Sequence, residues 1–201
     1  IRRQRQMCIR DRPHIEEKKS RKFLDSMLKR HAELLEDVVD KYTTKAAEAN
    51  TPIHPELAAS VLDELADEDA YFTVDTGMCN VWSSRYLTPN GKRDEAASFL
   101  HGTMANALPM AIGVQSAFPD RQVISWSGDG GLGMLLGELL TVKLHNLPIK
   151  TIVFNNSSLG MVKLEMLVAG FPDFETDHDK VNFAAIAEGV GIKSFRIEAV
   201  S

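Results

Sequence analysis

A glycine-rich loop between a strand-like segment and a helix-like segment is the feature that most constrains how this chain folds. The apolar run 122–126 (QVISW) predicts a buried strand, and the loop 127–133 (SGDGGLG) follows it directly. We predict a helix over 132–145 after the loop. Glycines let a backbone approach an anion closely, and the free amides at a helix start favour negative charge. The sequence therefore predicts an anion site at this point.

Strands and helices alternate along most of the chain. We predict helices at 55–66, 103–118, 132–145, from about 160 and at 183–188, and strands at 70–74, 122–126, 150–154 and 192–197. Strands separated by helices of this length imply right-handed crossovers and a parallel sheet. The predicted fold is α/β, a doubly wound parallel sheet with helices on both faces.

A long helix is predicted before this sheet, at 16–48. Its semi-apolar stripe consists of Leu24, Leu28, His31, Leu35, Val38 and Tyr42. We interpret it as a linker or bracing helix over 13–50, with a coiled coil as the alternative. The arginine-rich residues 1–12 are expected to be a non-native tail, and 51–201 to be the main domain.

Composition excludes several classes of protein. Hydrophobic residues make up 44% of the chain and charged residues 25%, as in ordinary globular proteins, and the net charge of -5 argues against nucleic-acid binding. No apolar run reaches the roughly 18 residues that a membrane span needs. The two cysteines, Cys8 and Cys79, lie far apart, which fits a reducing cytoplasm.

The loop also matches the G-x-G-x-x-G pattern of nicotinamide-dependent dehydrogenases, through Gly128, Gly130 and Gly133. That pattern expects a carboxylate at the end of the next strand, where this chain has Asn155 and Asn156. A carboxylate inside the loop would repel a diphosphate unless a cation lay between them. Asp129 therefore indicates a diphosphate bridged by Mg²⁺, which favours oxygen ligands.

Asn156 follows the next strand just as Asp129 follows the first. Because parallel strands end at the same edge of a sheet, we expect both side chains at the edge where α/β sheets bind ligands. Ser157 and Ser158 could add a backbone carbonyl to the same ion. The alternatives left open are a nicotinamide-dependent dehydrogenase and a non-catalytic nucleotide-binding domain.

These two motifs, with Asn156 placed 27 positions after Asp129, resemble the GDG…NN signature of thiamine diphosphate enzymes. The resemblance covers about residues 50–201. It implies that the metal is held by Asp129, Asn156 and the carbonyl of Ser158. It also implies that the diphosphate meets Gly130 and Gly131, and that the turn Thr76-Gly77 contacts it too.

The resemblance extends to the stretch 98–104 (SFLHGTM). Met104 matches the bulky residue that bends the cofactor, and the Gly102 carbonyl matches the acceptor for its 4'-amino group. Taken without the resemblance, Met104 would be interpreted as core filling.

Within the family, the segments HGTMANALP, LPIK and VFNNSSLGMVKLEM resemble pyruvate oxidase, of the quinone-reducing pyruvate dehydrogenase type. This resemblance implies that pyruvate is converted to acetate and CO2 and that electrons pass to FAD and then to quinone. Positions matching Met161, Val162 and Glu165 would face the substrate and flavin. An acetolactate synthase-like enzyme is the alternative.

The resemblance also implies partners outside the sequence. In the family, the catalytic glutamate belongs to a separate pyrimidine-binding domain and FAD to a middle domain, whose end the helix over 13–50 would form. We therefore expect 1–201 alone to be inactive. We expect a homo-oligomer when the protein is complete, and a domain truncated at its C-terminus. The expected location is the cytoplasm, with peripheral association to the inner face of the membrane through the absent C-terminal segment.

Overall fold

The computed structural model describes residues 20–43 and 52–199, in a chain that divides into two compact units, 1–40 and 41–201. Helix α2 (Lys22–Thr43) confirms the central part of the predicted long helix. The side chains of Phe23 and Leu28 are exposed on it. The predicted tail 1–12 and the predicted helix ends, 16–19 and 44–48, lie outside the described residues.

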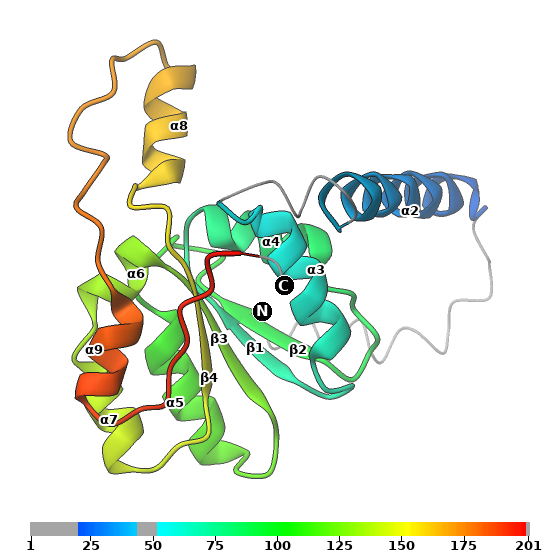
Figure 1. Cartoon of the computed structure of the whole chain (residues 1–201). Coiled ribbons are helices and arrows are strands. Elements are labelled where there is room, and N and C mark those ends of the chain that lie inside the picture. Colours follow the sequence, from blue (N-terminus) through cyan, green and yellow to red (C-terminus); the bar gives the residue numbers. More distant parts are fainter. Residues whose placement is uncertain (1–19, 44–51, 200–201) are drawn as a thin grey trace. The chain divides into compact units, whose positions relative to one another are not determined.

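A four-stranded parallel sheet organises the second unit. Its order is β2 (Asp94–Ala97), β1 (Tyr71–Val74), β3 (Val123–Gly128) and β4 (Lys150–Phe154). The chain leaves β1 toward one edge of the sheet and returns to build the other edge from β3, so the topological switch point lies between β1 and β3. The predicted parallel α/β sheet is confirmed, and its carboxyl ends lie along one edge (Figure 1).

Helices cover both sides of this sheet, as the doubly wound prediction requires (Figure 1). Helices α3 (Pro55–Leu65) and α4 (Met78–Tyr86) lie on one side. The other side carries α5 (Ala107–Ala117), α7 (Glu138–Leu144) and α9 (Phe183–Gly189). The core of that side contains the buried side chains Leu108, Leu132, Leu139 and Val142. Trp126 is fully buried and its indole donates to the Cys79 carbonyl at 2.9 Å, which ties α4 to the sheet.

Several element boundaries differ from the prediction. The helix expected at 103–118 begins at Ala107, because Gly102 and Ala105 take positive φ angles of 59° and 66° that no helix contains. The helix expected at 132–145 is split into α6 (Asp129–Met134) and α7. Helix α4 and the acidic edge strand β2 were not predicted.

The strand predicted at 192–197 is wrong. In the described part of the chain this segment pairs with no strand, and Phe195 and Ile197 are 73% and 75% exposed. Alternating apolar residues form a strand only where a neighbour accepts their backbone hydrogen bonds. The remaining helix, α8 (Gly160–Val168), has no buried residue and projects from the body of the fold (Figure 1).

Candidate functional site

The loop after β3 and the turn after β4 meet at one carboxylate. Asp129 is 4% exposed, and its Oδ1 accepts the Gly130 amide at 2.8 Å. Its Oδ2 accepts the Ser157 amide at 2.6 Å, across 28 residues of sequence. The two motifs that the sequence analysis joined are therefore in direct contact at the carboxyl edge of the sheet.

The turn after β4 is tightly folded around its own side chains. Asn156 Oδ1 accepts the Ser158 amide at 3.1 Å, and Ser157 takes a positive φ of 55°. Because Ser157 bonds Asp129, its neighbours Asn156 and Ser158 lie beside the same carboxylate. Carboxylate, amide and carbonyl oxygens are the ligands that suit Mg²⁺. The structure thus places the three predicted metal ligands on two loops that are in contact through Ser157, while their role as ligands stays a prediction.

Two glycines of the loop lie so close to neighbouring side chains that a Cβ at either position would force its neighbour to move. A Cβ at Gly131 would lie 2.0 Å from Asp75 Oδ2, and one at Gly130 would lie 2.7 Å from Leu159 Cδ2. The same Cβ at Gly130 would lie 3.6 Å from Met104 Cε. A bare backbone flanked by a methionine fits a loop that a diphosphate approaches closely, which agrees with the predicted cofactor contacts.

A third loop joins this group from β1. A Cβ at Gly102 would lie 3.7 Å from Thr76 Cγ2, so the turn after β1 and the loop before α5 are neighbours. Gly77, at φ 139°, precedes α4, and Gly102 has φ 59°, conformations that favour glycine. The predicted cofactor residues therefore come from four adjacent loops, after β1, before α5, after β3 and after β4. They lie beside the switch point, where α/β sheets bind ligands.

Asp75 is a buried carboxyl that the sequence analysis missed. It is 1% exposed, its Oδ1 accepts the Thr76 amide at 2.9 Å, and its Oδ2 has no hydrogen-bond partner among the described residues. Burial raises the pKa of Asp75, although the backbone amides of Thr76, Asn106 and Ala105 oppose the shift. The available signal was its position, since Asp75 follows β1 just as Asp129 follows β3.

Burial also makes the Cys79 thiol unreactive. This side chain is 2% exposed and its Sγ donates to the Asp75 carbonyl at 3.4 Å. Burial, followed by the nearby charge of Asp75, raises the pKa of Cys79 to about 12. The thiolate is the nucleophilic form, and a raised pKa keeps the thiol protonated. Cys79 is therefore a packing residue rather than a reactive one.

The segment 173–178, which we call the strap, runs along the turn after β4. The His178 amide donates to the Ser157 carbonyl at 3.0 Å, and the His178 imidazole Nε2 lies 3.6 Å from Asp129 Oδ2. His178 therefore stands beside the predicted metal carboxylate. Sequence reasoning missed it because the strap has neither periodicity nor a regular element to mark its position.

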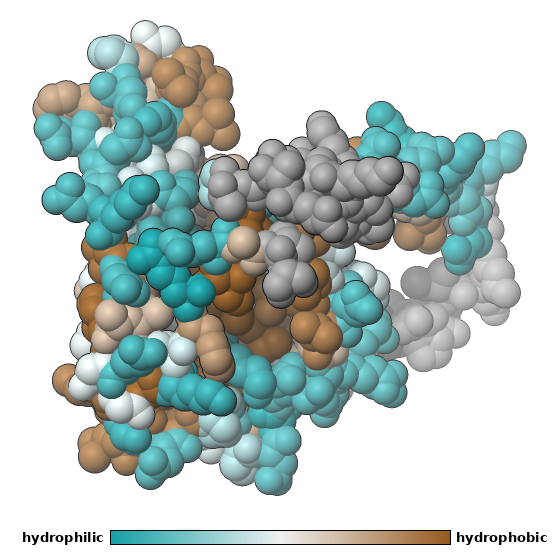
Figure 2. Space-filling model, viewed as in Figure 1, coloured by the Kyte–Doolittle hydropathy of each residue, from teal (hydrophilic) through white to brown (hydrophobic). Residues whose placement is uncertain are grey.

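The residues expected to face substrate and flavin lie on the projecting helix α8. Met161 is half-buried, whereas Val162 and Glu165 are exposed. Helix α8 and the segment that follows it to residue 178 form a lobe, and Figure 2 shows hydrophobic surface on it. Its exposed apolar side chains include Val162, Leu164, Leu167, Val168, Phe171 and Phe174. The roles of Met161, Val162 and Glu165 toward substrate and flavin stay predictions.

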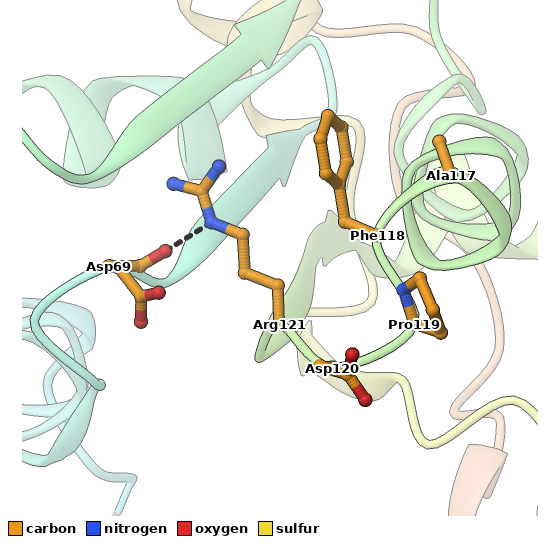
Figure 3. Close-up of a pocket in the computed structure, with 6 residues that line it drawn as sticks. All are labelled: Asp69, Ala117, Phe118, Pro119, Asp120 and Arg121. Atoms are coloured by element: carbon orange, nitrogen blue, oxygen red, sulfur yellow. Dashed lines mark hydrogen bonds between the residues drawn. The ribbon is translucent and has the colours of Figure 1, made fainter.

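A hollow of about 290 Å³ lies at the opposite edge of the sheet, near the amino ends of β1 and β3 (Figure 3). Its lining includes Arg121, whose guanidinium donates to the carbonyls of Asp69 and Lys92 and to the carboxylate of Asp94. These bonds connect the amino ends of β1, β2 and β3 and engage the guanidinium fully. The hollow is therefore separate from the group of loops at the carboxyl edge.

The fold and the group of loops define an α/β cofactor-binding domain. Residues 75–201 match the family described as "Thiamine pyrophosphate enzyme, C-terminal TPP binding domain", and the chain belongs to this family. Thiamine pyrophosphate is another name for thiamine diphosphate. The match begins at Asp75 and includes the loops after β1, β3 and β4. Membership favours the thiamine diphosphate interpretation over the nicotinamide one.

Three relatives show how far the likeness extends. The "Putative thiamine pyrophosphate-containing protein YdaP" of Bacillus subtilis (strain 168) is 35% identical over 92% of this chain and 31% of its own length. The "Acetolactate synthase large subunit" of Porphyra purpurea is 35% identical over 78% of this chain and 27% of its own. The "Pyruvate oxidase" of Lactiplantibacillus plantarum is 29% identical over 74% of this chain and 25% of its own. The chain thus spans between a quarter and a third of these relatives.

Among the helices of residues 20–43 and 52–199, none combines the length and apolar character that a membrane crossing requires.

Proposed function

We propose that this domain holds the diphosphate of thiamine diphosphate through Mg²⁺ bound by Asp129, Asn156 and the carbonyl of Ser158. The observation that carries the proposal is the 2.6 Å contact of the Ser157 amide with Asp129, which joins the two ligand-bearing loops. A carboxylate placed in a phosphate-type loop needs a cation to offset its repulsion of the diphosphate. The donor set consists of hard oxygen atoms and fits that ion.

The other loops would orient the cofactor. Gly130 and Gly131 would let the diphosphate approach a backbone that carries no side chains, and Thr76-Gly77 borders them from β1. Met104 lies against Gly130, where its side chain would support the bend of the cofactor. When bound, thiamine diphosphate supplies the carbon-centred chemistry of 2-oxo acid decarboxylation, and the protein supplies binding and orientation.

For the whole protein, we propose a pyruvate-decarboxylating flavoenzyme that releases acetate and CO2 and passes electrons to FAD and then quinone. The relative named pyruvate oxidase and the resemblance of residues 153–166 support this proposal. Met161, Val162 and Glu165 would face substrate and flavin. FAD and the pyrimidine ring would be held by other domains, in a homo-oligomer that associates peripherally with a membrane.

Acetolactate synthase is the second candidate, because relatives of that name are 35% identical to this chain. An assay of the full-length protein with pyruvate, the cofactors and a quinone analogue distinguishes the two activities. Acetate and CO2 with reduced quinone support the oxidase, whereas acetolactate with unreduced quinone supports the synthase.

Calorimetry tests the binding role directly. Thiamine diphosphate should bind in the presence of Mg²⁺ and lose most of its affinity when EDTA is added, and NAD should not bind. Asp129→Asn keeps the shape of the side chain while removing its charge, and it should abolish the Mg²⁺ dependence. If Asp129→Asn binds the cofactor as the parent does, the metal role is wrong.

A further inference from the structure

The strap (173–178) is bonded to the turn after β4 along its length. The Leu159 amide donates to the Thr176 carbonyl at 2.8 Å, and the His178 amide donates to the Ser157 carbonyl at 3.0 Å. Between these bonds, Ser158 faces Asp177 in an antiparallel bridge. The strap therefore holds the backbone of the turn at Ser157, Ser158 and Leu159.

One lysine on α8 fixes the strap in place. Lys163 Nζ lies 2.7 Å from Asp173 Oδ2 and 2.7 Å from Asp177 Oδ2. Between these two carboxylates, Thr176 is 3% exposed and its hydroxyl donates to Asp173. The hydrogen bonds of Lys163 lower the pKa of both carboxyls, and those of Asp173 and then Asp177 raise the pKa of Lys163. Lys163 is thus shared by both ends of the strap.

The conformation of Ser157 needs such support. Its positive φ of 55° is unfavourable for a residue with a side chain. In this conformation its amide donates to Asp129 while its carbonyl accepts from His178. Releasing the strap removes the second of these bonds and leaves the turn free to relax away from Asp129.

We propose that Lys163 is a positioning residue for the metal site, holding the Ser157-Ser158 turn against Asp129 through the strap. The inference rests on the proposed function of Asp129, Asn156 and Ser158. An isolated exposed ion pair contributes little to the stability of a protein. Lys163 differs because two carboxylates share it around the buried Thr176, which bonds the turn itself.

The test compares Lys163→Met, which keeps an apolar stem, with Lys163→Arg, which keeps the charge. Lys180→Met, an exposed lysine just beyond the strap, is the matched control. Titration of Mg²⁺ at fixed thiamine diphosphate should show about a tenfold higher half-saturating Mg²⁺ for Lys163→Met, the range for outer partners of metal ligands. Affinity for the cofactor at saturating Mg²⁺ should change much less. The half-saturating Mg²⁺ concentration of Lys163→Arg should stay close to that of the parent.

Hydrogen exchange of the Ser157 amide without cofactor gives a readout that does not depend on binding. Exchange should accelerate in Lys163→Met and stay at the parental rate in Lys180→Met. An unchanged Ser157 amide, or a Mg²⁺ requirement equal to that of the parent, overturns the inference. A different outcome would count against the proposed function alone. If the parent protein shows no Mg²⁺-dependent cofactor binding but Lys163→Met still accelerates exchange, Lys163 positions the turn and the proposed function is wrong.

Discussion

The loop after β3 and the lobe formed by α8 and the strap reach the same carboxylate by different means. The loop is buried, and its glycines pack against Asp75 and Leu159 with no room to spare. The lobe has no buried residue on α8 and relies on ion pairs and backbone bonds. Packing therefore fixes one half of the site, whereas charges that salt can screen fix the other.

The largest expected difference between the two regions is in thiol reactivity. At pH 8, a pKa of about 12 leaves a thiolate fraction of about 1 in 10,000 at Cys79. A cysteine introduced by Val168→Cys, at a position 81% exposed, should have an ordinary thiol pKa. In a Cys8→Ser background, labelling of Cys79 should be at least a thousandfold slower, roughly in proportion to its thiolate. Comparable rates would show that the loops around Cys79 open readily.

Gly131→Ala should be the most damaging substitution in the buried loop. The new Cβ would lie 2.0 Å from Asp75 Oδ2, and we expect a loss of about 2–3 kcal/mol in the free energy of unfolding, with loss of cofactor binding. Gly133→Ala is the control, because its Cβ would meet nothing within 4 Å. Urea denaturation measures both, and adding Asp75→Ala to Gly131→Ala should recover part of the loss.

Asp75→Asn should change how stability depends on pH. The folded state holds the Asp75 proton more tightly than the unfolded chain, because burial raises this pKa. Asp75 therefore favours folding at low pH, and that contribution is lost as the pH rises through the raised pKa. Between pH 4 and 7 the free energy of unfolding of the variant should therefore fall less than that of the parent. Urea denaturation of both proteins at several pH values measures this. An equal pH dependence of the free energy of unfolding in parent and variant would contradict the expectation.

The smallest effect is expected on the exposed face of the lobe. Val168 is 81% exposed, so Val168→Ala should change the free energy of unfolding by less than about 0.5 kcal/mol. Leu132→Ala, at a buried position, should cost about 2–5 kcal/mol and serves as the contrast. A cost above about 1 kcal/mol at Val168 would show that its side chain is covered in solution.

The same contrast explains what the sequence could and could not predict. The strands β1, β3 and β4 are short apolar runs ended by Asp75, Asp129 and Asn155, so local pattern fixes both the sheet and the edge where ligands bind. Strand β2 is formed by acidic and small residues, which carry no β-propensity, and pairing with β1 decides its structure. The break between α6 and α7 likewise lies within an apolar run that predicts one helix.

The strap was beyond prediction for a physical reason. Its structure depends on the pairing of Lys163 with Asp173 and Asp177, and on bonds from Thr176 and His178 to the turn. These contacts join irregular segments, whose conformations have no period to read. The resemblance could predict the three metal-binding positions, but not the contacts that hold the turn after β4 in place.

The bond from the Ser157 amide to Asp129 has a consequence for how the site arises during folding. It closes a chain segment of 28 residues that contains α6, α7 and β4, so it forms only after β4 has docked beside β3. Loop closure of this length carries an entropic cost that early local structure does not offset. Affinity for the cofactor should therefore appear late in refolding, and a ligand that binds only the closed form would draw the chain toward its native state by mass action.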